Sequence, residues 1–166
     1  KETVFPNWGQ VYTTHDTKLD SIDQLAGRTV AGLSQDIYFK SLKELTDKAN
    51  LEVNYRGTDE YDEVFRLVQQ QEVDAGILPR LYGDLNEKKF NVSKTTIIVK
   101  LSELRFAARK SANQKILATI DTHLHQLKAD NNSLYFQSIS RWLGQQDDRA
   151  DIDLDLSENE KKWLSE

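Results

Sequence analysis

Strand-like and helix-like segments alternate through the middle of the chain, and this alternation constrains the fold more than any other feature of the sequence. A β-rich run at residues 28–33 is followed by residues 36–50, whose apolar side chains recur at helical spacing. The pattern repeats with a strand-like run at 51–55, a helical stripe over 61–68 and an apolar run at 73–78. Strands that alternate with helices of this length predict βαβ units, which build a parallel-type sheet with flanking helices. The expected fold class is therefore α/β.

Turn signals place the ends of these elements. Gly57-Thr58-Asp59 supplies a turn and a helix cap, and Pro79 closes the third run. After a polar stretch, residues 95–99 and 104–108 are predicted to be two more strands, separated by residues 100–103. The sheet would then contain five strands.

The last part of the chain is predicted to be helical. Apolar spacing marks one helix over residues 116–127 and another over 134–143, with a break and a new cap at 131–133. A length of 166 residues suits one domain better than two. The expected division is an α/β domain at residues 1–144, an acidic linker at 145–156 and the start of a further helix at 157–166.

Composition and motifs exclude several kinds of chemistry. The 22 Lys and Arg residues against 27 Asp and Glu give a net charge of −5, which argues against nucleic acid as a partner. The absence of cysteine excludes thiolate catalysis, disulfides and Cys-based zinc sites. His123 and His125 lie two positions apart on a predicted helix and face different sides, so they do not form a metal pair. Nucleotide-binding and serine-hydrolase motifs are also missing. No cofactor and no metal is implied.

The ends of the sequence suggest a piece of a longer protein. No apolar run approaches the ~18–20 residues that span a bilayer, and the first residues lack the layout of a signal peptide. The sequence contains no methionine and begins at Lys1. We expect the translation start, and a targeting or anchoring segment, to lie upstream.

Candidate binding residues follow the three predicted parallel strands, because ligands of open α/β sheets sit beyond the carboxyl ends of strands. The three segments are Ser34-Gln35-Asp36, Arg56-Gly57-Thr58 and Pro79-Arg80. Ser34 or Asp36 could instead only cap the following helix. Arg80 fits a carboxylate or phosphate, and fits a surface salt bridge equally well. The acids Asp59, Asp62 and Glu63 are better explained by helix capping and the helix dipole than by acid–base catalysis.

Four stretches in order resemble the type II periplasmic solute-binding fold of the polar amino-acid binding family. They are LDSIDQLAGRTVAGL at 19–33, EVDAG at 72–76, LRFAARK at 104–110 and the helices within 120–142. The opening residues 2–12 and the closing residues 156–164 look more like variants fused to membrane-bound histidine kinases and diguanylate cyclases. The resemblance implies an extracytoplasmic, periplasmic sensor domain, not itself an enzyme, of a bacterial receptor that is bound to the membrane only through its other parts.

The resemblance also implies what this chain lacks. The family places its amine-binding acid five residues after the aspartate of the V-D-A motif, and that position is Pro79 here. The family has roughly 80–90 residues of first lobe before the point that matches Lys1, so this chain resembles lobe two plus the C-terminal helices. Those helices would expose apolar faces that normally pack on the absent half, which would allow a homodimer or a domain swap.

In such a receptor a small polar or anionic solute would close two lobes around it and bias the signalling output. Ser34, Gln35 and Asp36 would contact the solute, Arg80 would face an anionic group, and Thr58 would lie beside them. Tyr38 and Trp8 would form a stacking wall or belong to the core and hinge. Three alternatives stay open: a dimerisation module, a dehydratase on the same fold, and the effector domain of a cytoplasmic regulator.

Overall fold

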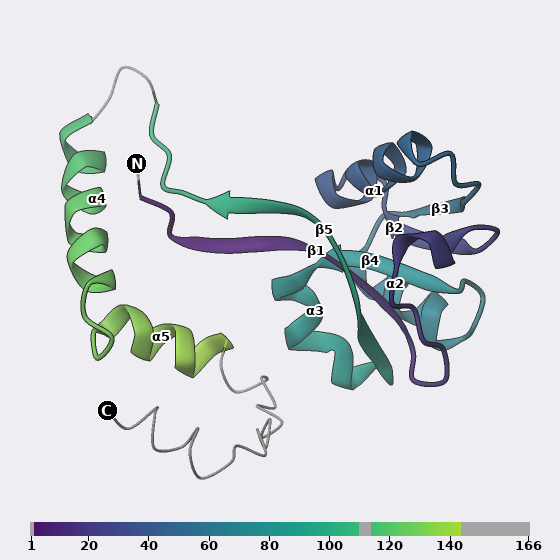
Figure 1. Cartoon of the computed structure of the whole chain (residues 1–166). Helices are drawn as coiled ribbons and strands as arrows, with labels where there is room; N and C mark the ends of the chain where they lie inside the picture. Colours follow the sequence, from purple (N-terminus) through teal and green to yellow (C-terminus); the bar gives the residue numbers. More distant parts are fainter. Residues whose placement is uncertain (1, 110–113, 144–166) are drawn as a thin grey trace, which may run out of the picture. The chain divides into compact units, whose positions relative to one another are not determined.

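The fold combines a five-stranded sheet with helices on both of its faces. A computed structural model describes residues 2–109 and 114–143 (Figure 1). The strands are β1 (Phe5–Thr14), β2 (Thr29–Leu33), β3 (Asn54–Thr58), β4 (Ala75–Pro79) and β5 (Val92–Leu104). The helices are α1 (Ile37–Lys48), α2 (Tyr61–Gln69), α3 (Arg80–Asn86), α4 (Gln114–Lys128) and α5 (Leu134–Leu143), with short 3₁₀ turns at Ile22–Leu25 and Glu87–Lys89. The predicted α/β class is confirmed.

The strand order of the sheet is β3-β2-β4-β1-β5. β2 runs parallel to both β3 and β4, as the alternating pattern predicts, so the carboxyl ends of these three strands share one edge. β1 runs antiparallel to β4 and to β5, which makes the sheet mixed. Gly9 pairs with Pro79, so the first half of β1 reaches the edge at which β4 ends. That edge is called the carboxyl edge below.

Each face of the sheet carries its own hydrophobic core, because successive side chains of a strand point to opposite faces. Val11, Val30 and Ile77 lie in one buried cluster with Phe39 and Leu42 of α1. Their chain neighbours Tyr12, Ala31 and Leu78 lie in the other, with Val64, Phe65 and Val68 of α2. Figure 1 shows α1 on one side of the strands and α3 on the other.

Two glycines let these helices approach the strands closely. A β-carbon on Gly32 of β2 would lie 2.3 Å from the ring of Phe39, and one on Gly76 of β4 would lie 2.5 Å from Val64. Neither distance is possible for packed carbon atoms, so the two strand positions need glycine. The packing of both helices on the sheet is thus specified at the sequence level.

The structure corrects several predicted elements. The strand predicted at 51–55 is β3 at Asn54–Thr58, so Gly57 and Thr58 belong to a strand rather than to a turn. The N-cap position of the helix that follows is Glu60, not one of residues 57–59. The strand predicted at 95–99 lies in β5, which continues through the predicted interruption by a β-bulge, with Lys100 at φ 49°. β5 ends at Leu104, so the strand predicted at 104–108 is wrong for residues 105–108. β1 and α3 were not predicted as elements.

Contacts divide the chain into two compact units, Lys1–Gln126 and Leu127–Glu166. In the described part of the second unit, the amide of Ser133 donates to Asp130 and that of Gln137 donates to Ser133, which confirms the predicted break and restart before α5. Lys128 lies over the ring of Tyr135. The predicted linker at 145–156 and helix at 157–166 lie outside the described residues. No described helix is both long and apolar enough to span a membrane.

Candidate functional site

At the carboxyl edge, hydrogen bonds join the ends of β2 and β3. Leu33 pairs with Thr58, and the backbone amide of Ser34 donates to the Thr58 carbonyl at 2.9 Å. The Ser34 hydroxyl donates to the same carbonyl at 3.0 Å. The buried Thr58 side chain donates in turn to the Glu60 carbonyl, at 3.2 Å. Ser34 and Thr58, predicted separately, therefore lie side by side and hold the two strand ends together.

Asp36 joins the starts of two helices. Its Oδ1 accepts a hydrogen bond of 2.6 Å from the amide of Tyr38, which is the N-cap bond of α1. Its Oδ2 accepts a bond of 2.5 Å from the hydroxyl of Tyr61, the first residue of α2. Burial, followed by the contact with Asp36, raises the pKa of Tyr61, so the phenol keeps its proton and stays a donor. The capping role considered for Asp36 is confirmed.

An open hollow of about 490 Å³ lies next to these contacts. Its lining residues are Leu33, Asp59, Glu60, Tyr61, Asp62, Tyr82 and Asn86. The rings of Tyr61 and Tyr82 lie 4.9 Å apart at an angle of 38°. The Tyr82 hydroxyl donates to Asp62 across the hollow from α3 to α2. The hollow thus has an aromatic wall and an acidic rim, and it sits where β2 and β3 end.

Most of this hollow was not predicted from the sequence. Tyr61 was assigned to the apolar stripe of a helix, and Tyr82 and Asn86 lie in a polar stretch to which no element was assigned. The available signal was the run Asp59–Glu63, in which a tyrosine stands among four acids. Asp62 and Glu63 lie in the first turn of α2, as the dipole interpretation predicts, but the N-cap residue Glu60 makes no side-chain capping bond.

Arg80 occupies a different part of the same edge. Its Nε donates to Asp84 Oδ2 at 2.8 Å, and Lys94 Nζ lies 3.7 Å from the other oxygen of this buried carboxylate. The guanidinium stands over the ring of Trp8 at 4.4 Å and near that of Phe5 at 5.6 Å. Trp8 donates through Nε1 to Gln10. The salt bridge considered for Arg80 is present, and Trp8 contacts the same guanidinium.

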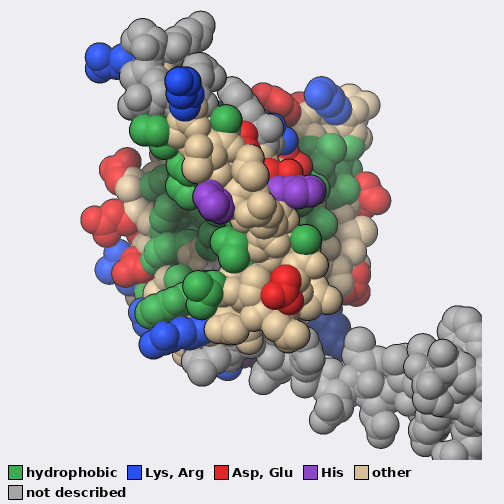
Figure 2. Space-filling model, turned by 90° about the vertical axis from the view of Figure 1, so that its left-hand side faces the viewer, with side chains coloured by type: hydrophobic (Ala, Val, Ile, Leu, Met, Phe, Trp, Pro, Cys, Tyr) green, Lys and Arg blue, Asp and Glu red, His purple; other side chains and the backbone are tan. Residues whose placement is uncertain are grey.

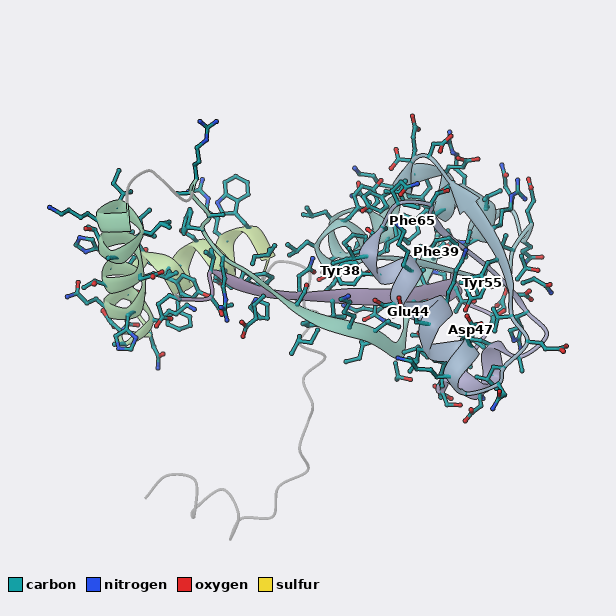
Figure 3. The ribbon with its side chains drawn as sticks, turned by 90° about the horizontal axis from the view of Figure 1, so that it is seen from above. Tyr38, Phe39, Glu44, Asp47, Tyr55 and Phe65 are labelled. Atoms are coloured by element: carbon teal, nitrogen blue, oxygen red, sulfur yellow. The ribbon has the colours of Figure 1, made fainter. Side chains whose placement is uncertain are left out.

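The remaining predicted residues lie apart from the hollow. Tyr38 is only 4% exposed, packs in the core beneath α1, and shares a hydrogen bond of 2.6 Å with Ser102 of β5 (Figure 3). Gln35 is exposed and accepts from Lys40 Nζ at 3.1 Å. Arg56 pairs with Glu72 at 2.9 Å. Within residues 2–109 and 114–143 no group of three His, Cys, Asp or Glu side chains is arranged to hold a metal ion.

Comparison with known proteins identifies the fold. No protein-family profile matches the chain, and neither does any curated protein sequence. Solved structures do match. The extracellular-binding protein YtmK of an amino-acid ABC transporter from Bacillus subtilis aligns with a TM-score of 0.74 and 17% identity. The alignment covers 87% of this chain and 62% of YtmK. The glutamate-bound ligand-binding core of GluR0 from Nostoc punctiforme aligns with a TM-score of 0.61 and 19% identity, over 85% and 63%.

A reconstructed ancestral arginine-binding protein, crystallised with glutamine, gives a TM-score of 0.64 at 19% identity, over 87% of this chain and 63% of that one. The sequence identities are low, so these alignments establish the fold and leave the ligand open. This chain spans less than two thirds of the length of each of these proteins. The solute-binding fold that the sequence resembles is the fold that the structure has.

Proposed function

We propose that this chain is the solute-binding part of an extracytoplasmic sensor domain, which binds a small polar solute at its carboxyl edge and belongs to a bacterial membrane receptor. The observation that carries the proposal is the hollow at the ends of β2 and β3. In open α/β sheets this edge is where ligands bind, because loops and helix starts supply polar groups there. The likeness to amino-acid binding proteins supports the same use of the edge.

Each predicted residue has a place in this proposal. Ser34 and Thr58 hold the β2 and β3 ends in register, and Asp36 fixes the start of α1 against Tyr61. Arg80, whose guanidinium lies over Trp8, faces an anionic group of the solute through the nitrogens that Asp84 does not use. Gln35 is exposed beside the start of α1, and Tyr38 supports the edge from the core.

The receptor assignment rests on sequence. The opening and closing segments resemble sensor domains that are fused to kinases and cyclases, and such domains are periplasmic. The domain itself performs no catalysis in this proposal and uses no cofactor. The receptor has two conformations that bind the solute with different affinity. Solute binding shifts the equilibrium toward the conformation of higher affinity, and the output domain responds to this change of conformation.

A thermal-shift and calorimetry screen against amino acids, dicarboxylates, sugars and phosphates tests the proposal. A solute that binds the folded chain raises its melting temperature. At a hundredfold excess over the dissociation constant, binding raises the free energy of unfolding by about 2.7 kcal/mol. Any charged solute that shifts the wild type should shift Asp59→Arg differently, and Asp16→Arg identically. Asp16 is exposed and follows β1 at the opposite edge of the sheet. Equal shifts in all three proteins would place the solute elsewhere.

Exposed apolar side chains favour a second candidate function, a module through which two copies of this chain associate. On β5, Ile98 is 60% and Leu101 is 70% exposed. Figure 2 shows many hydrophobic side chains open to solvent on one face of the molecule. Others in the first unit are Leu104, Phe106 and Ile116. Sedimentation over a hundredfold concentration range tests this candidate. A protein that stays monomeric throughout would exclude it. Leu101→Lys should weaken any dimer, because it places a charge in the apolar surface.

A further inference from the structure

We propose that the side chain of Glu87 is a pH-sensitive switch, which stays buried against the sheet when it is protonated and turns out to solvent, loosening α3, when it ionises. The switch operates in the free protein, so it goes beyond the proposed function and needs no solute. It bears on the carboxyl edge because α3 begins there with Arg80 and also carries Tyr82. Three observations on the described residues support it: a buried carboxyl oxygen, a second carboxylate beside it, and a buried hydroxyl.

The buried carboxyl oxygen is Oε2 of Glu87. Glu87 follows α3 directly and begins the 3₁₀ turn Glu87–Lys89, which packs against β5. Its Oε2 is shielded from solvent and has no hydrogen-bond partner among the residues that the structure describes. An ionised carboxylate loses its hydration in this position, and no donor replaces the lost water. Protonation of the carboxyl removes that cost, and so does movement of the side chain into water.

The second carboxylate is that of Asp84, which precedes Glu87 by one turn and is 7% exposed. Its two oxygens already face two cations: Arg80 Nε donates to Oδ2 at 2.8 Å, and Lys94 Nζ lies 3.7 Å from Oδ1. Asp84 therefore remains ionised and places a negative charge beside Glu87. Two neighbouring carboxyl groups of this kind resist ionising together, so the proton is held by the one without a partner, Glu87.

The buried hydroxyl is that of Tyr12 in β1. Tyr12 is fully buried, and within the described part of the chain its hydroxyl has no hydrogen-bond partner. The hydroxyl lies against α3 at Gly83, where a β-carbon would overlap it. Burial, followed by the charges of Asp84 and Glu87, raises the pKa of Tyr12, so the phenol keeps its proton. The polar contact between α3 and the sheet is thus incomplete, and a helix of seven residues depends on such contacts to stay in place.

The charged and titratable groups that face Glu87 come from each element packed around it. They are Lys94 of β5, Asp84 of α3, the adjacent Lys88, His15 after β1, and Tyr12 of β1. The basic groups lower the pKa of Glu87, but burial is the largest cause and Asp84 adds to it, so the pKa is raised above its usual 4.5. The bound proton therefore stabilises the fold below pH 4.5, and this stabilisation is lost as the pH rises through the raised pKa.

Carboxyl NMR of the whole chain tests whether Glu87 holds a proton. Glu44, an exposed glutamate on α1, is the internal reference (Figure 3). In a titration from pH 3 to pH 8 we expect the side-chain carboxyl of Glu87 to lose its proton at a higher pH than that of Glu44. This measurement uses the wild type alone, so it does not depend on how any variant folds.

Two variants of equal charge test whether ionisation loosens α3. Glu87→Gln resembles the protonated side chain at every pH, and Glu44→Gln makes the same change on an exposed face. At pH 7 the amides of residues 80–87 should exchange roughly threefold faster in the wild type than in Glu87→Gln, because only the wild type carries the buried charge. At pH 4 the two should exchange alike. As the pH rises from 4 to 8, the urea midpoint of the wild type should fall relative to that of Glu87→Gln, and Glu44→Gln should follow the wild type.

Each contrary result overturns a definite part of the switch. If Glu87 and Glu44 titrate together, Glu87 does not hold the proton and the switch is wrong. If Glu87 titrates at higher pH but the exchange of residues 80–87 is the same in the wild type and Glu87→Gln at pH 7, the proton binds without moving α3, and the switch is again wrong. All these measurements are made without solute, so their failure leaves the proposed function standing, and a failed solute screen leaves the switch standing.

Discussion

The starts of α1 and α2 lie at the same edge of the sheet and are built in opposite ways. α1 begins with a complete cap, because Asp36 accepts from the Tyr38 amide and from the Tyr61 hydroxyl. α2 begins at Glu60, whose side chain makes no capping bond, and it opens directly onto the hollow. Both helices pack closely on a strand glycine, α1 on Gly32 and α2 on Gly76, so they are alike in this respect and differ in their first turns.

The polar side chains at the start of α1 are bonded within the protein, whereas those at the start of α2 are largely open to a ligand. Both oxygens of Asp36 are occupied by the protein itself, so the residue that sequence analysis placed in the binding set mainly stabilises the fold. The acids at the start of α2 carry less of the fold, and Asp59 carries none that the described contacts show. A polar side chain that makes no bond within the protein can replace its water contacts by ligand contacts without a loss of folding stability. The start of α2 is therefore the better place to look for binding.

The largest effect that tests this comparison is expected from Asp36→Ala. The change removes the N-cap of α1, worth about 1 kcal/mol, and an acceptor for a partly buried phenol, worth about 1.5 kcal/mol. We expect the free energy of unfolding to fall by about 2–3 kcal/mol in urea titrations. Glu60→Ala is the matched change at the start of α2, and it should stay within about 0.5 kcal/mol of the wild type. Similar losses in the two variants would contradict the comparison.

A smaller effect is expected from Tyr61→Phe, which keeps the ring in the hollow and removes only its bond to Asp36. The free energy of unfolding should fall by about 1 kcal/mol at pH 7. Because the pKa of Tyr61 is raised in the folded state, the unfolded chain loses this proton first as pH rises above about 10. The wild type should therefore lose stability in that range, and the variant should lose less. Urea midpoints measured from pH 8 to pH 11 give both results, and parallel pH profiles would mean that folding does not raise the pKa of Tyr61.

The spacing of apolar residues predicted α1, α2 and the strands between them, because the residues that this spacing selects are the ones buried in the folded protein. The apolar spacing of α1 and α2 follows their buried faces, with Leu42 and Val64 fully buried. β3 was placed too early because Val53, whose side chain packs against the core, precedes the strand without belonging to the ladder. β1 was missed because its residues 9–13 are buried from both faces, and even Gln10 is 5% exposed, so no alternation marks them.

The hollow could not be predicted from local pattern. It needs Tyr82 of α3 beside Tyr61 of α2, and a pairing of residues 21 positions apart leaves no periodic trace in the sequence. The carboxyl edge itself was predictable, since it follows from parallel strands alone. Ser34, Asp36 and Thr58 were therefore found by position, while their bonds to one another and to Tyr61 depend on how the helices pack.

The smallest expected effect concerns Ser34, which stands just before α1. Ser34→Ala removes the hydroxyl that donates to the Thr58 carbonyl, but the Ser34 amide donates to the same oxygen at 2.9 Å and remains. A carbonyl that keeps one of two donors stays satisfied, so we expect a loss of only about 0.5 kcal/mol in urea titrations. The space around the hydroxyl is tight, since a β-carbon on Gly57 would lie 2.5 Å from Ser34 Oγ. Gly57→Ala should therefore destabilise more than Ser34→Ala, and the double variant should recover part of the loss because the clashing oxygen is gone. Additive losses would mean that Ser34 Oγ does not fill that space, and that the edge between β2 and β3 is held by backbone pairing alone.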